Sequence, residues 1–267
     1  MKHWLMSLVL ILAVLGQTTA AKEGFDHTAW DALLKQHVRV LQDGKITQVD
    51  YQGFTEQRSA LKAYLAALSA VDKVEFDAFS KDEQLAFLIN AYNAWTVELI
   101  LTEWPELDSI KDLGSLFRSP WSKDIASLFG KQVTLDNIEH DMIRGSDRYQ
   151  EPRIHFAVNC ASIGCPALRA EAYQGELLDW QLEQQTRLFL ADKTRNRLVE
   201  DELQLSSIFK WYKQDFAKGW LGYDSLEKFL LAYKDALSLT PQAVQALQDG
   251  EMDITYLDYD WGLNRTP

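Results

Sequence analysis

Apolar and polar side chains alternate along residues 153–160, and this period of two predicts a β-strand. The alternation would place Phe156 and Cys160 on one face of the strand and His155 on the other. The sequence therefore predicts a strand that carries a histidine and ends in a cysteine, with the two side chains on opposite faces.

The hydrophobic period changes after this strand. Residues 161–164 break the alternation, and the alanine-rich residues after Pro166 predict a helix with proline at its first position, where a missing N–H is tolerated. Cys165 would cap this helix, and the free N–H groups and the positive end of the helix dipole would favour its thiolate. We therefore expect two sulfurs in different settings, one ending a strand and one beginning a helix.

The strongest helical pattern covers residues 81–104. Ser80 can cap this helix, with Glu83 as its capping-box partner. Apolar residues occur almost all the way round, so the helix should be buried at the centre of the protein. Asn90 and Asn93 lie one turn apart within this apolar surface, and buried amides need hydrogen-bond partners. They are expected either to hold a neighbouring loop or to face a site.

The rest of the chain mixes helical and strand periodicity, with no internal repeat and no linker that divides it. Further helices are expected near residues 28–43, 55–68, 136–144, 176–192, 208–216, 225–236 and 240–248, and further strands near 45–51, 130–135, 196–205 and 252–258. This pattern predicts an α+β fold: a single, mostly helical domain over residues 21–267, with a small antiparallel or mixed sheet that includes the strand before Cys160.

Residues 1–20 have the pattern of a signal peptide: a short basic end, an apolar run too brief for an ordinary membrane span, and small residues at the expected cleavage site. The mature protein is expected to be periplasmic or secreted, with the periplasm of a Gram-negative bacterium preferred and no stable membrane insertion after cleavage. An uncleaved anchor is the alternative.

The charge and the aromatic content of the sequence indicate which binding partners to expect. The formal net charge of the 267 residues is −12, which excludes nucleic acid and anionic membrane surfaces as expected partners, because both attract basic patches. Nine Trp, ten Tyr and twelve Phe should mostly form the core, with some lining a groove. Nothing in the sequence indicates a cofactor, and the histidines and cysteines lack recognisable metal-ligand spacing.

Several segments together resemble a known family. They are Leu88-Ile-Asn-Ala-Tyr-Asn-Ala94, Leu135-Asp-Asn-Ile-Glu-His140, the stretch from Arg153 through Cys160 to Gly164-Cys-Pro-Ala-Leu168, and Tyr259-Asp-Trp-Gly-Leu-Asn264. The chain resembles the bacterial branch of the family catalogued as domain of unknown function 547, over about residues 49–264. The resemblance implies one domain and implies no particular activity. The resemblance also supports Cys160 as a candidate nucleophile beside Cys165, because the cysteine at the end of the strand is the more regular feature of the family pattern.

The residues themselves indicate one chemistry. A thiol, an imidazole, an orienting group and backbone donors are the parts of a cysteine hydrolase or acyl-transferase. The residues that could supply them are Cys160, Cys165, His140, His155, Glu139, Asn90 and Asn159, with N–H groups near residues 167–168 for the oxyanion. His140 is the preferred base, because His155 would face away from Cys160. The substrate would be an unidentified envelope peptide or small molecule with a peptide or amide bond.

Histidine precedes cysteine here, which is the reverse of papain-like enzymes and matches their circularly permuted relatives. A permuted papain-like core is therefore a further hypothesis, based on analogy alone.

Other functions remain open at this level. In an oxidising compartment Cys160 and Cys165 could form a structural disulfide, and the protein would then be a non-catalytic binding or interaction module. A thiol–disulfide redox protein is less favoured, because the usual redox motif has two residues between its cysteines. The catalytic hypothesis requires a reduced sulfur beside an imidazole.

Overall fold

The computed structural model describes residues 24–115 and 117–267, so the expected signal peptide lies outside the described residues. The α-helices are α1 (Thr28–His37), α2 (Tyr51–Glu56), α3 (Arg58–Ala70), α4 (Lys73–Ala78), α5 (Lys81–Leu101), α6 (Leu178–Ala191), α7 (Ser207–Trp211), α8 (Leu226–Ala232) and α9 (Pro241–Asp249). Within those two ranges no helix is both long and apolar enough to cross a bilayer.

Short helical segments join these helices. The 3₁₀ segments are η1 (Gln42–Gly44), η2 (Ile110–Leu113), η3 (Pro120–Ser122), η5 (Pro152–Phe156), η6 (Gly175–Leu177), η7 (Lys213–Phe216) and η8 (Trp220–Gly222), and η4 (Asn137–Arg144) is a π-helix.

The strands form small separate sheets. β1 (Val38–Leu41) pairs antiparallel with β2 (Ile46–Val49), and β3 (Ala126–Leu128) pairs antiparallel with β4 (Lys131–Val133). β5 (Arg197–Val199), β6 (Glu202–Ser206) and β7 (Asp253–Leu257) form a mixed sheet in which β6 is antiparallel to β5 and parallel to β7. The expected mostly helical α+β class with a mixed sheet is confirmed, whereas a single domain over residues 21–267 stays a prediction.

The central helix α5 forms as its sequence predicts. The hydroxyl of Ser80 accepts a hydrogen bond from the N–H of Glu83 at 3.2 Å, which satisfies one of the free donors at the helix start. Seventeen residues of α5 are buried, because apolar side chains occur on every face. The buried polar side chains of this helix therefore need hydrogen-bond partners inside the protein.

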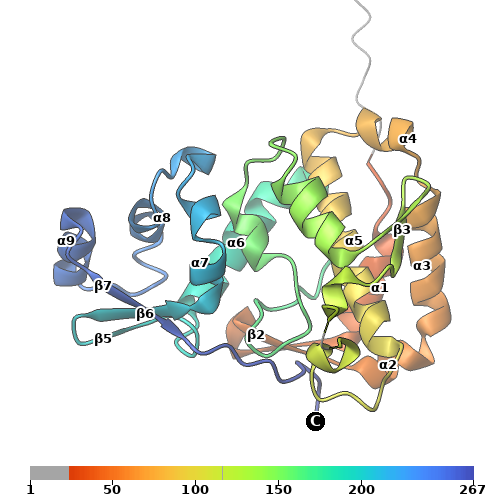
Figure 1. Ribbon diagram of the computed structural model, residues 1–267, viewed down its shortest axis with the longest axis horizontal. Helices are drawn as coiled ribbons and strands as arrows, with labels where there is room; N and C mark the ends of the chain where they lie inside the picture. The colour runs from red at the N-terminus through yellow and green to blue at the C-terminus, as the bar shows by residue number, and fades with distance from the viewer. Residues whose placement is uncertain (1–23, 116) are drawn as a thin grey trace, which may run out of the picture.

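The described residues form two hydrophobic clusters. The helices that carry these clusters lie side by side along the long axis of the molecule (Figure 1). The larger cluster packs α1, α3 and α5 together. The smaller one contains the rings of Phe156, Phe189, Phe209, Phe216 and Phe229, from η5, α6, α7, η7 and α8. The segment around η4 and η5 therefore lies where the two clusters meet.

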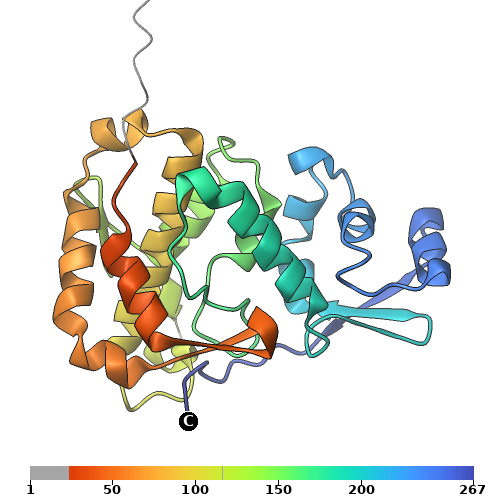
Figure 2. The same cartoon turned by 180° about the vertical axis from the view of Figure 1, so that it is seen from behind.

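The chain after β7 returns to the larger cluster (Figure 2). The N–H of Leu263 donates to the carbonyl of Asp108 at 2.8 Å, and the N–H of Val49 donates to the carbonyl of Asn264 at 2.8 Å. This tail passes residues 160–165 on its way, since Ser162 and Leu263 form an isolated β-bridge. Distant parts of the sequence are thus brought to the cysteines.

The expected strand over residues 153–160 is wrong, and no strand among the described residues contains Cys160. Residues 152–156 form the 3₁₀ helix η5, with proline at its start and the Glu151 carboxylate accepting the N–H of Arg153 at 2.9 Å. The same carboxylate also pairs with the Arg153 guanidinium at 2.7 Å. These local bonds outweigh the alternating pattern, so the argument that His155 faces away from Cys160 fails with it.

The expected helix after Pro166 is also wrong. Residues 166–169 have no regular secondary structure, so Cys165 caps no helix. The side-chain amides of Asn159 and Gln185 donate to the carbonyls of Pro166 and Ala167, each at 2.7 Å. Carbonyls that a helix would have used internally are satisfied by side chains instead.

Candidate functional site

A cavity of about 280 Å³ lies between the two hydrophobic clusters. Its walls come from α5, η4, η5, the loop of residues 157–166, α7 and the C-terminal tail. The predicted site residues that line it are Cys160, Cys165, His140, His155 and Glu139. Clefts between packed units are common ligand sites, so this cavity is the candidate site.

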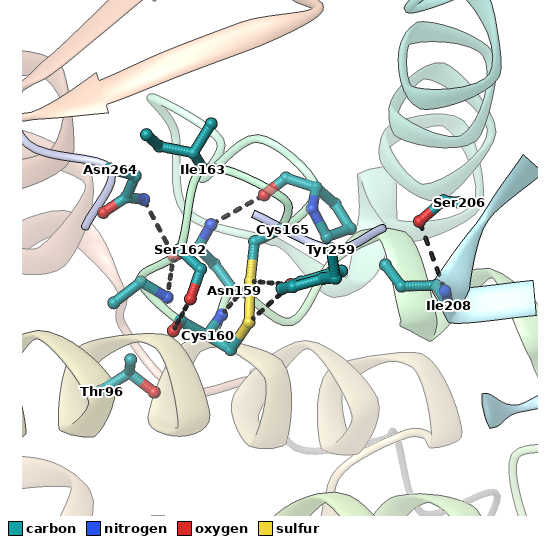
Figure 3. The surroundings of a disulfide bond; sticks show 12 residues. Thr96, Asn159, Cys160, Ser162, Ile163, Cys165, Ser206, Ile208, Tyr259 and Asn264 are labelled. Carbon is teal, nitrogen blue, oxygen red and sulfur yellow. Dashed lines mark hydrogen bonds between the residues drawn. A yellow bond between two sulfur atoms is a disulfide. The ribbon is translucent and has the colours of Figure 1, made fainter. Parts of the chain in front are cut away.

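The two cysteines form a disulfide in one wall of the cavity (Figure 3). Cys165 is 2% exposed, whereas Cys160 is partly exposed. The hydroxyl of Tyr259 lies 3.0 Å from Sγ of Cys160 and donates to Sγ of Cys165 at 3.1 Å. Of the two cysteines, Cys160 is therefore the one more open to a reactant.

The loop that carries the cysteines is held by asparagine side chains. Oδ1 of Asn93 accepts the N–H of Asn159 at 2.8 Å, and Oδ1 of Asn159 accepts the N–H of Ala161 at 2.9 Å. Ala161 has a φ of 61°, a left-handed conformation that costs roughly 1–2 kcal/mol in a residue with a Cβ. Such strain persists only where surrounding contacts impose it, and it occurs often next to functional groups. Here it fixes the backbone directly after Cys160.

His155 is oriented by a carboxylate. Its Nε2 lies 2.8 Å from Oδ2 of Asp215, and its ring stacks on Tyr212 with the ring centres 3.9 Å apart. Burial lowers the pKa of His155, and the hydrogen bond to Asp215 only partly opposes this. The imidazole is therefore neutral at neutral pH.

Asp215 is ionised despite its burial. Burial alone would raise its pKa, but hydrogen bonds from His155 and Arg144 outweigh burial and hold the pKa well below the usual range. Arg144 Nε lies 2.6 Å from Oδ2, and Lys218 Nζ lies 3.0 Å from Oδ1. An ionised carboxylate can only accept, so Nε2 of His155 carries the proton and Nδ1 carries a lone pair.

Glu139 and His140 both project from η4 into the cavity wall. Glu139 is 6% exposed. Burial raises the pKa of the Tyr92 and Tyr212 phenols, and the neighbouring Glu139 carboxylate raises it further. His140 is more open: its Nδ1 lies 2.8 Å from Nη1 of Arg144 and 3.8 Å from Oε1 of Glu139. Since Arg144 can only donate, Nδ1 of His140 is already used as an acceptor.

Two polar atoms in this wall lack hydrogen-bond partners. They are Oε1 of Glu139 and Nδ1 of His155, both buried and both without a partner among the residues that the structure describes. Buried polar atoms are nearly always paired, so unpaired ones need an explanation. Two unpaired acceptors beside one cavity suit a ligand that donates hydrogen bonds.

Asn90 and Asn159, two of the expected site residues, form hydrogen bonds to backbone groups. Asn90 donates to the carbonyl of Tyr173 at 2.8 Å and accepts its N–H at 3.0 Å, and Asn90 does not line the cavity. Asn159 holds the cysteine loop and contacts no imidazole among the described hydrogen bonds. Within residues 24–115 and 117–267, no cluster of three His, Cys, Asp or Glu side chains is placed to bind a metal ion.

Sequence analysis missed Asp215 and Tyr259 as site residues. Asp215 could have been recognised from the sequence. It falls on the apolar face of the predicted helix over residues 208–216, where a buried carboxylate needs a partner. In the sequence, Tyr259 stands out only as part of the motif at residues 259–264. Its position beside the sulfurs depends on the returning tail, which no local pattern reveals.

Comparison with known proteins identifies a family. Residues 76–190 match the family described as "Protein of unknown function, DUF547", and this match supports the family expected from the sequence, without distinguishing a branch of it. The motif at Tyr259–Asn264 lies outside the matched residues. No curated protein and no solved structure matches the chain.

Proposed function

We propose that the cavity is the active site of a cysteine-dependent hydrolase or acyl-transferase that acts on peptide or amide bonds, and that the disulfide is its oxidised, inactive form. One observation carries this proposal: a neutral His155, held by ionised Asp215, lines the same cavity as the Cys160 sulfur and has an unpaired Nδ1. Thiol, imidazole and carboxylate are the groups from which such sites are built.

Cys160 is the nucleophile in this proposal. Cys160 is the more exposed residue of the two, and the helix cap that would have activated Cys165 is absent. Cys165 then forms the disulfide that holds Cys160 in its oxidised, unreactive form. Reduction by a dithiol breaks the S–S bond, leaves both cysteines as thiols and converts the dithiol to its own disulfide.

His155 is the base, because its carboxylate partner fixes both the ring and the tautomer. Nδ1 takes the proton of the Cys160 thiol, the thiolate adds to the substrate carbonyl, and the leaving amine departs with that proton. Water or a second acceptor then releases the acyl group from sulfur. His140 stays a candidate, although Arg144 occupies its Nδ1.

Two donors lie beside the disulfide. The N–H of Cys160 lies 2.8 Å from Sγ of Cys165, and the Tyr259 hydroxyl lies close to both sulfurs. Once the disulfide is reduced, these donors can stabilise the thiolate or the oxyanion. The unpaired Oε1 of Glu139 can accept an N–H from an amide substrate.

The proposal includes export of the protein to the periplasm or the medium. The leader-like residues 1–20 support it, as does a disulfide, since disulfides persist in oxidising compartments. The intact mass of the exported protein should lack residues 1–20. A mass that retains them would contradict export with cleavage.

A non-catalytic binding module is the second candidate. The 2% exposure of Cys165 and the dense bonding around residues 157–166 favour it, because both are typical of a structural disulfide. In that case the cavity binds a ligand and its sulfurs never react.

Acylation by p-nitrophenyl acetate separates the two functions. Reduced wild-type protein should release a burst of p-nitrophenol and gain one acetyl group on Cys160, whereas Cys160→Ser should show neither. Cys165→Ser is the matched control, because it removes the disulfide but keeps the nucleophile, and it should react without reductant. Failure of Cys165→Ser to acylate faster than free cysteine would exclude the hydrolase and leave the binding module.

A further inference from the structure

A second cavity, of about 520 Å³, lies beside the larger hydrophobic cluster. It shares no lining residue with the cavity that contains the cysteines. Its apolar wall includes side chains from α4, α5, β3, β4 and η4: Phe76, Leu88, Leu128, Val133 and Met142. Its volume falls in the range of small-molecule sites.

Phe129 completes the apolar wall under strain. It occupies the turn between β3 and β4 with a φ of 55°, followed by Gly130 with a φ of 73°. Such turns favour Asn-Gly, because a left-handed backbone is unfavourable for a bulky residue. The ring packs on Phe76 with the ring centres 4.7 Å apart and lines the cavity. A strained aromatic at a cavity wall is typical of a ligand contact.

The rim of this cavity is cationic. Lys73, Lys131 and Arg148 lie there, and one carboxylate, Asp77, faces them. Asp77 is paired with Lys73 at 2.5 Å. Lys131 and Arg148 form no ion pair among the salt bridges of the described residues. Two cations without an ion-pair partner among the described residues therefore line one cavity, in a protein whose formal net charge is −12.

Tyr149 adds a neutral hydroxyl to the lining of this cavity. Burial raises the pKa of the Tyr149 phenol, so its hydroxyl stays protonated at neutral pH. That hydroxyl makes a long hydrogen bond of 3.4 Å to Oε1 of Gln84. The amide of Gln84 is occupied by the carbonyls of Phe76 and Phe79, each at 3.1 Å. An incoming acceptor at hydrogen-bond distance would replace the long bond to Gln84 as the partner of the Tyr149 hydroxyl.

We propose that this second cavity binds an amphipathic carboxylate. Its apolar body contacts the wall under Phe129, and its carboxylate lies between Lys131 and Arg148, with Tyr149 as a neutral donor. The charge at the rim selects the carboxylate over a cation of the same chain length, and the apolar wall selects a chain over a small hydrophilic anion. This binding is independent of any chemistry at the cysteines.

Calorimetric titration of the full mature chain with sodium octanoate tests the proposal. Octyltrimethylammonium chloride, which has the same chain and the opposite charge, and sodium acetate, which has the charge without the chain, are the control ligands. Octanoate should bind, and each control ligand should bind at least about tenfold more weakly. Equal binding of octanoate and octyltrimethylammonium would overturn the assignment of the head group.

Variants at the exposed rim complete the test without disturbing the core. Lys131→Gln/Arg148→Gln should weaken octanoate binding about tenfold. Lys62→Gln/Lys234→Gln, which removes the same charge from exposed positions outside the cavity lining, should leave binding unchanged. Absence of octanoate binding, or equal loss in both double variants, would overturn the proposal. Neither result bears on acylation of Cys160.

Discussion

Nε2 of His155 donates to Oδ2 of Asp215 across 2.8 Å, with both side chains almost completely buried. Asp215→Asn keeps the shape of the pair but removes the charge that selects the tautomer. We expect the acylation rate of reduced protein to fall by about 10³–10⁴, as for loss of the corresponding carboxylate in other triads. Stopped-flow release of p-nitrophenol gives the rate. A fall of less than about tenfold would show that Asp215 does not orient the base.

Tyr259 touches both sulfurs, so its hydroxyl should stabilise a thiolate at Cys160 once the disulfide is reduced. Burial raises the pKa of Tyr259, which keeps the phenol protonated and able to donate. Tyr259→Phe in the Cys165→Ser background should raise the pKa of the Cys160 thiol by about one unit. Thiolate absorbance measured against pH gives this value, and an unchanged titration would remove Tyr259 from the site.

Asn159 and Asn90 offer a matched pair of buried amides. Each bonds to backbone atoms, but only Asn159 holds the loop of the cysteines. Asn159→Ala and Asn90→Ala should each lower the free energy of unfolding by about 1–3 kcal/mol. Only Asn159→Ala should also slow acylation of the reduced protein. Urea denaturation and the burst rate measure the two effects, and equal slowing in both variants would refute a specific role for this loop.

His27 should make stability depend on pH. Burial lowers the pKa of His27 from 6.5 to about 4 in the folded chain, while its Nδ1 hydrogen-bonds the Tyr64 hydroxyl at 2.7 Å. Between pH 6.5 and 4, His27 is protonated in the unfolded chain but neutral in the folded chain. Protonation therefore favours the unfolded chain, so the free energy of unfolding falls as the pH drops from 6.5 towards 4 and is unaffected by His27 above pH 6.5. The loss is roughly 3 kcal/mol. Comparison of wild type and His27→Gln in urea at pH 7.5 and 4.5 measures it, and equal pH dependence in both would contradict the assignment.

Local sequence signals predicted the elements that local interactions stabilise. The Ser80 cap and the apolar surface of residues 81–101 specify α5 without help from distant residues. The helices expected near residues 225 and 240 are α8 and α9, which the side chains of Ser225 and Thr240 cap locally. In each case the interaction that decides the structure is a few residues away in the chain.

The site could be predicted only in part, because long-range contacts build it. One error in the site is local: the alternation of residues 153–160 indicates a strand, but the Glu151 carboxylate caps a 3₁₀ helix there through the N–H of Arg153. The other contacts are distant in the chain. Asp215 reaches His155 across 60 residues and Tyr259 reaches Cys160 across 99. The residue types were therefore visible in the sequence, while the pairing of His155 with Asp215 needed the fold.

The most direct test is the rate at which iodoacetamide alkylates Cys160 in Cys165→Ser, with and without His155→Gln, at neutral pH. If His155 activates Cys160, alkylation of Cys165→Ser will be faster than that of free cysteine, and loss of His155 will slow it at least about tenfold. An alkylation rate equal to that of free cysteine, and unchanged by His155→Gln, would contradict the account.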